Sequence, residues 1–128
     1  MALAIRKAEP YFPAKKQAKS SGYMAFIRSL PCAVTGQSGV EAAHVSYANP
    51  TYGHYGRGKT QKAADLFALP LTSEEHRRQH SMNEREFWES TGINPHLLCL
   101  KLWGVWSNYG DEAHPFAEAI IHQTRLGI

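Results

Sequence analysis

Cysteine is scarce in this chain. Only Cys32 and Cys99 occur among the 128 residues, far apart and without partners at zinc-ligand spacing. Two isolated thiols support neither a disulfide framework nor a four-cysteine zinc site, so we expect both to be buried or partly buried. No run approaches the ~18 apolar residues that a membrane span requires, and the N-terminus lacks the apolar core of a signal peptide. These absences predict a cytoplasmic protein without a structural zinc ion.

Internal repeats and the glycine fingerprint of nucleotide-binding loops are also missing. The remaining composition, with 43% hydrophobic and 20% charged residues, is typical of one globular domain of this length. The net charge of +3 is unevenly spread, because residues 1–19 hold one acid and five cations, namely Arg6, Lys7, Lys15, Lys16 and Lys19. We therefore predict a basic, flexible N-terminal arm over residues 1–19 and a single domain over residues 20–128. Such an arm suits phosphate contacts, and a merely solubilising arm is the alternative.

Several helices are predicted from apolar periodicity and capping residues. The first starts near Ser20, repeats apolar residues at three- and four-residue steps, and ends at Pro31. Later helices have an N-cap pair at Asn83 and Glu86, a cap followed by proline at Asn94 and Pro95, and a closing glycine after residues 115–125. Their leucines and aromatic residues are expected to form the core.

Residues 32–45 form two short apolar pieces around a glycine-containing turn, which predicts a β-hairpin with His44 near its end. A long segment over residues 46–63 follows, rich in Gly, Tyr, Asn and Pro, and we expect no regular structure in it. Its aromatic residues alternate with Arg57, Lys59 and Lys62, a composition that suits stacking on bases and contacts with phosphates. A flexible insertion is the alternative. Residues 65–71 then form an apolar edge strand or an extended link.

The stretch of residues 71–80, LTSEEHRRQH, carries two histidines four positions apart. In a helix, His76 and His80 would lie on one face with Cβ atoms roughly 5 to 6 Å apart, close enough to bind one divalent ion. A helix is predicted because Ser73 can cap the N-terminus, acidic residues occupy the first turn and cations follow. The alternative is a solvated surface helix, and only a third ligand from elsewhere favours the metal site.

Known metalloenzyme motifs with similar histidines do not fit. The motif H-E-x-x-H requires Glu where Arg77 stands, and H-x-x-E-H requires Glu where Gln79 stands. Zinc deaminases require a C-x-x-C that this chain lacks. The helical pair is therefore a metal-binding pattern without the base of a metalloprotease.

Taken together, a strand ending in His44, a connecting loop and a helix with His76 and His80 resemble the HNH, or ββα-metal, nuclease motif. More closely, the chain resembles small phage and prophage HNH proteins related to the recombination-enhancement nucleases. This resemblance covers about residues 23–104 and is carried by the runs LPCAVTGQSGVEAAHVSYA, KAADLFALPL and EEHRRQHSMNEREFWESTGINPH. It implies an α+β fold in which a β-hairpin, a long loop and a metal-binding helix are surrounded by further helices.

The resemblance also implies roles for individual residues. His44 matches the general base of the HNH motif, and His76 and His80 match its metal ligands. Asp65 falls near the central Asn of the motif, where it would hold the loop or provide an oxygen ligand. Ala43 occupies a ligand position and cannot bind an ion, so Asp65, His54, His44, water or substrate phosphate must complete the coordination. Relatives often carry cysteines where this chain has Thr35 and Thr72.

The expected function is that of a metal-dependent endonuclease that hydrolyses DNA phosphodiester bonds, encoded by a phage or prophage. Zn²⁺, Ni²⁺ or Mn²⁺ would suit imidazole ligands, while Mg²⁺ prefers oxygen, so the metal stays open. The cations expected to contact phosphate groups are Arg57, Lys59, Lys62, Arg77 and Arg78. A recombination or phage protein is a further expected partner. The alternatives are a non-catalytic DNA-binding accessory protein and a structural protein whose histidines satisfy core hydrogen bonds.

Overall fold

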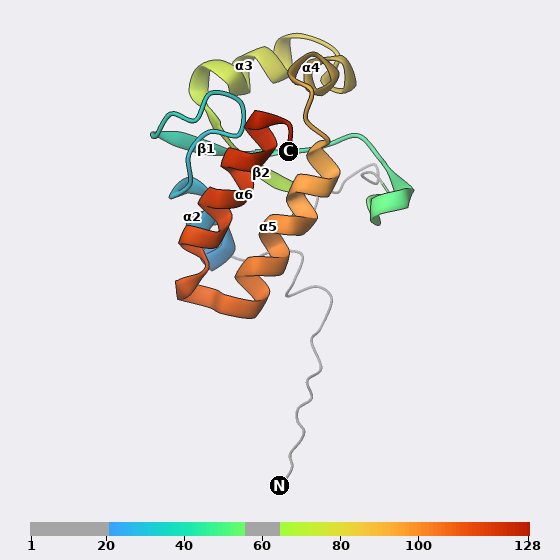
Figure 1. The fold of residues 1–128 in the computed structure, drawn as a ribbon. Helices are drawn as coiled ribbons and strands as arrows, with labels where there is room; N and C mark the ends of the chain where they lie inside the picture. The colour runs from blue at the N-terminus through green and yellow to red at the C-terminus, as the bar shows by residue number, and fades with distance from the viewer. Residues whose placement is uncertain (1–20, 56–64) are drawn as a thin grey trace, which may run out of the picture.

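The computed structural model describes residues 21–55 and 65–128 (Figure 1). Within these ranges the fold is α+β, with one two-stranded antiparallel sheet and five α-helices. The elements are α2 (Ser21–Arg28), β1 (Val40–His44), β2 (Ala68–Thr72), α3 (Ser73–Ser81), α4 (Glu84–Thr91), α5 (Pro95–Tyr109) and α6 (His114–Leu126), with 3-10 turns at Pro50–Tyr52, Asp65–Phe67 and Gly110–Glu112. The N-terminal arm expected over residues 1–19 lies outside the described residues. Within the described ranges, every helix is too short or too polar to cross a membrane.

The β-sheet corrects the hairpin expected within residues 32–45. β1 pairs with β2, in a register that runs from Val40 opposite Thr72 to His44 opposite Ala68. Residues 32–36 instead form a tight turn, in which the Gly36 N–H donates to the Cys32 carbonyl oxygen over 2.8 Å. The hairpin prediction was wrong because two apolar pieces close in sequence were taken as partners, whereas the longer apolar run beyond residue 67 supplies the strand. Pro70 is tolerated in β2 because each strand of a two-stranded sheet has one unpaired edge.

The helix starts predicted at Asn83 and Asn94 are confirmed. The Asn83 side chain accepts a hydrogen bond from the Glu86 N–H at 3.0 Å, and the Asn94 side chain accepts one from the Leu97 N–H at 3.1 Å. These bonds satisfy backbone donors that have no partner inside the first helical turn. Local capping chemistry therefore fixes where α4 and α5 begin.

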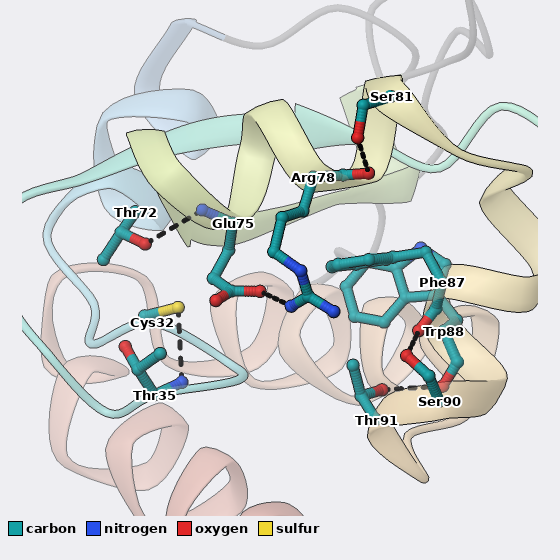
Figure 2. A network of polar contacts seen from close by, with 10 residues as sticks. All are labelled: Cys32, Thr35, Thr72, Glu75, Arg78, Ser81, Phe87, Trp88, Ser90 and Thr91. Carbon is teal, nitrogen blue, oxygen red and sulfur yellow. Dashed lines mark hydrogen bonds and ion pairs between the residues drawn. The ribbon is translucent and has the colours of Figure 1, made fainter.

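The N-cap of α3 lies one residue earlier than predicted. Thr72, not Ser73, accepts the hydrogen bond from the Glu75 N–H, at 3.3 Å (Figure 2). Thr72 is also the last residue of β2, so the strand passes into the helix without a linker. The start of α3 is consequently fixed by strand pairing as well as by sequence.

The hydrophobic core includes Phe87 and Trp88 of α4 as well as residues of the strands and of the helices α2, α5 and α6. In Figure 1 α3 and α4 lie above the strands, α2 and α5 lie below them, and α6 passes in front. The apolar face predicted for α2 is buried, with Tyr23 and Ile27 fully covered, and the Tyr23 ring meets Trp103 of α5 edge-on at 4.8 Å between centroids. Both cysteines are buried, as expected, and burial raises the pKa of the Cys99 thiol.

The segment after β1 is more regular than expected. Residues 49–54 form a compact turn closed by an isolated β-bridge between Asn49 and His54, so the expectation of no regular structure was wrong for this part. The His54 ring nitrogen Nε2 lies 2.8 Å from the Val45 carbonyl oxygen, and His96 Nε2 of α5 lies 2.9 Å from the Tyr47 carbonyl oxygen. Sequence patterns missed this turn because two buried histidines far apart in sequence hold it. Residues 56–63 lie outside the described ranges.

His96 predicts a pH dependence of folding stability. Burial lowers the pKa of its ring below the ordinary value of 6.5. The unfolded chain therefore takes up a proton at pH values where the folded protein does not, and the free energy of unfolding should fall as the pH drops below about 6.5. Urea unfolding at pH 7.5 and 5.5 should show a smaller loss for His96→Gln than for the wild type. His122→Gln, which changes an exposed histidine on α6, is the control, and equal losses in all three proteins would contradict the prediction.

Candidate functional site

Two pairs of histidine and carboxylate lie at opposite ends of β1. At its start, Glu41 Oε1 is 2.7 Å from His76 Nδ1 of α3. At its end, His44 Nε2 is 2.9 Å from Asp65 Oδ1, in the turn that precedes β2. All four side chains are partly exposed, with His44 at 32% and His76 at 24%. Strand β1 thus contributes one member to each pair.

Helix α3 runs alongside β1 in the same direction. His76 near its start contacts Glu41, and Gln79, almost one turn later, donates from Nε2 to the His44 carbonyl oxygen over 3.1 Å. His80 directly follows Gln79, so its backbone lies at the same end of β1 as His44. The structure therefore brings the backbones of the predicted base and the second predicted ligand to the same end of β1, although the His44 side chain pairs with Asp65 and the His80 side chain lines a hollow together with His76.

A carboxylate on α4 holds this arrangement together. Glu84 accepts hydrogen bonds from the Ser46 N–H, at 3.2 and 3.1 Å to its two oxygens, and from Gln79 Nε2 at 2.9 Å. Gln79 is 3% exposed, and its amide nitrogen faces two acceptors, which fixes the orientation of the side chain. Glu84 and Gln79 therefore tie the end of β1 to both α3 and α4.

The two helical histidines face each other beside an open hollow. Their ring centroids are 4.8 Å apart, at an interplanar angle of 42°. The hollow has a volume of about 430 Å³, and the described residues that line it are Glu41, Ser73, His76, Arg77, His80 and Ser81. The predicted spacing of His76 and His80 on one helix face is confirmed, and the surface beside them has room for a ligand.

A complete metal-binding group is not preformed. Among residues 21–55 and 65–128, no three His, Cys, Asp or Glu side chains are grouped so that they could hold an ion. Ala43 is fully buried, and His54 is 3% exposed and packed against Phe67 and His96. His54 is therefore not placed to complete a site on α3. A divalent ion at His76 and His80 would need further ligands from solvent or substrate.

The two arginines of α3 have different surroundings. Arg77 is exposed and lines the hollow. Arg78 forms an ion pair with Glu75, and its guanidinium carbon lies 5.3 Å from the centre of the Phe87 ring (Figure 2). Arg77 is thus better placed than Arg78 for a ligand at the hollow. The expected phosphate contacts Arg57, Lys59 and Lys62 fall outside the described residues.

Cys32 and Thr35 lie in the turn before β1. The Thr35 N–H donates to the Cys32 sulfur over 3.4 Å (Figure 2). Burial raises the pKa of this thiol, but hydrogen bonds from Thr35 and from the backbone of residues 34 and 72 outweigh it and hold the pKa below its usual value. The structure thus gathers Cys32, Thr35 and Thr72 in one place, with a single thiol among them.

Glu41 and Glu84 were not identified as site residues from the sequence. Glu41 precedes Ala43 by two positions, so the alternation of a strand puts both on one face, and this was the available signal. Its partner could not be foreseen because it depends on the docking of α3. Glu84 resembles any acidic residue in the first turn of a helix, and its role appears only once Ser46 and Gln79 are seen to meet it.

Comparison with known proteins gives a family but no activity. A family model described as "Protein of unknown function (DUF968)" matches residues 8–103, which is well over half of the chain. Neither the curated proteins nor the solved structures contain a match. The case for a function therefore depends on the geometry of the site and on the motif.

The role of Glu84 can be measured as folding stability. Glu84→Ala would remove the acceptor of the Ser46 N–H and one of the two acceptors of the Gln79 amide nitrogen, and a buried donor without a partner costs ~1–3 kcal/mol. Urea unfolding should show a loss of this size. Glu86→Ala, which removes an exposed carboxylate from the same helical turn, should change the free energy of unfolding by less than about 0.5 kcal/mol. Similar losses in the two variants would show that Glu84 does not hold the site together.

Proposed function

We propose that this chain, which belongs to the DUF968 family of unknown function, is a metal-dependent endonuclease that hydrolyses phosphodiester bonds in DNA. The observation that carries the proposal is the pair His44 and Asp65, mounted at the end of a strand whose backbone is bonded to the helix of His76 and His80. The order of β1, β2 and α3 agrees with the coarse arrangement that the HNH resemblance implies.

In this proposal His44 is the general base. An ionised carboxylate only accepts hydrogen bonds, so the proton shared with Asp65 belongs to His44 Nε2. The lone pair then remains on Nδ1, which can take a proton from a water molecule as it attacks phosphorus. A neutral imidazole is suited to this step because its free nitrogen can accept the proton. Asp65 would orient the ring and stabilise the positive charge that it gains.

His76 and His80 would hold the divalent ion. Such an ion neutralises charge on the phosphate and stabilises the departing oxygen when it is bound. Water and substrate oxygens would occupy the other coordination positions, because Ala43 offers no ligand. Two imidazole ligands favour Zn²⁺, Ni²⁺ or Mn²⁺ over Mg²⁺.

Phosphate contacts would come from basic side chains. Arg77 is the described residue best placed for this role, because it is exposed and lines the same hollow as the two histidines. Arg57, Lys59 and Lys62 complete the proposed set by sequence alone. Binding through these charges should weaken as the salt concentration rises, because each phosphate contact releases counterions.

A second candidate is a DNA-binding accessory protein that retains the fold without turnover. Two observations favour this candidate, the buried Ala43 and the lack of a third grouped ligand in the part of the chain that the structure describes. It predicts salt-sensitive DNA binding without cutting in any divalent ion. The two candidates therefore differ in a single assay of plasmid nicking over a panel of metals.

The proposed base is tested by His44→Ala. Plasmid nicking by the purified protein should require a divalent ion and should fall about 10²- to 10⁴-fold in this variant, which is the usual contribution of a general base. Asp65→Asn should lose less, because an amide oxygen can still accept from His44 Nε2. His122→Ala, on the exposed face of α6, should cut like the wild type. Nicking by His44→Ala at the wild-type rate would exclude His44 as the base.

The proposed ligands are tested by metal content. The wild type, dialysed against a slight excess of Zn²⁺ or Ni²⁺, should retain about one ion per chain, as expected for a single site. The double variant His76→Ala/His80→Ala should retain almost none and should fail to cut. Equal metal in both proteins, measured by atomic emission, would remove these two histidines from the proposal.

A further inference from the structure

Glu41 is a carboxylate that contacts a proposed metal ligand, His76. It stands two positions before Ala43 on β1, on the same face of the strand. Its Oε1 atom lies 2.7 Å from His76 Nδ1, while the His76 ring faces the His80 ring at 4.8 Å. All three side chains line the same hollow. Strand, helix and hollow therefore meet at the His76 ring.

We infer that Glu41 is the positioning residue of the metal site, which fixes the tautomer and the orientation of His76 so that Nε2 is left to bind the ion. The inference rests on the proposed metal site at His76 and His80. Because a carboxylate accepts only, the hydrogen bond places the ring proton on Nδ1. The lone pair is then on Nε2, the nitrogen that remains for a cation.

The chemistry of imidazole ligands supports this role. A histidine that binds a metal through one nitrogen generally donates its other N–H to a carboxylate, a carbonyl or a water molecule. That second contact fixes the ring plane and makes the free nitrogen a better electron donor. In this chain Glu41 makes that second contact with His76.

The position of Glu41 also compensates for the residue at 43. Ala43 is fully buried and has no donor atom, so the strand contributes no direct ligand there. Glu41, two residues earlier on the same face of the strand, has a side chain that is 54% exposed and contacts His76 of α3. In this proposal β1 would not coordinate the ion, and Glu41 would instead orient the histidine that does.

The first measurement is the tautomer of His76 in the metal-free protein. Long-range ¹H–¹⁵N spectra at pH 7.5 should show a protonated Nδ1 and an unprotonated Nε2 in the wild type. Glu41→Gln should keep this tautomer, because its amide oxygen still accepts, and Glu41→Ala should lose the preference. A wild-type ring protonated on Nε2, or a ring unaffected by Glu41→Ala, would overturn the inference.

The second measurement is the affinity for Zn²⁺ and Ni²⁺ by calorimetry. Glu41→Ala should weaken binding about 10- to 100-fold, as is usual when the outer partner of a histidine ligand is removed. Glu41→Gln should retain most of the affinity. Glu74→Ala removes an exposed carboxylate from the first turn of α3 and controls for the change of charge, so its affinity should stay within about twofold.

The remaining outcomes separate this inference from the endonuclease proposal. Loss of affinity in Glu41→Gln as large as in Glu41→Ala would make Glu41 a direct ligand and overturn the positioning role. Wild-type protein that takes up neither ion would overturn it as well. Wild-type protein that binds metal and shows the expected tautomer, but cuts no DNA, would refute the proposed activity and leave the role of Glu41 intact. Full metal affinity in Glu41→Ala, together with normal cutting, would refute the positioning role of Glu41 and leave the proposed activity intact.

Discussion

Thr72 is the residue on which the geometry of the site depends, because it belongs to two elements at once. It pairs with Val40 at the end of β2, and its side chain caps the first turn of α3. With no linker between strand and helix, the direction of α3 is set by the strand pairing. The helix is thereby aligned with β1, and its successive turns meet Glu41 and then His44.

The parts of the fold that follow from local chemistry could be predicted. The N-cap asparagines predicted where α4 and α5 begin, and the spacing of His76 and His80 predicted that both rings lie on one helix face. The partner of β1 could not be predicted in the same way, because strand pairing joins residues distant in sequence and no local pattern specifies the register. The contacts of Glu41 and Glu84 likewise depend on how α3 and α4 dock at β1 and at Ser46 beyond its end, so neither residue stood out in the sequence.

The same chemical arrangement, an imidazole held by a carboxylate, occurs twice around β1 with opposite nitrogens engaged. His44 meets Asp65 through Nε2, and His76 meets Glu41 through Nδ1. In the proposed enzyme this difference assigns different work to the two rings, proton transfer to the first and cation binding to the second. In this proposal each carboxylate would orient its histidine, since a neutral imidazole has one donor and one acceptor and fixing either defines the other.

The chain between β1 and β2 is anchored at both ends, by His54 on the Val45 carbonyl and by Asp65 on His44. The two anchors meet adjacent residues, Val45 and His44, at the end of β1. The chain that leaves β1 and the chain that enters β2 are therefore both fastened to the end of the strand that carries the proposed base, which restrains it from two directions.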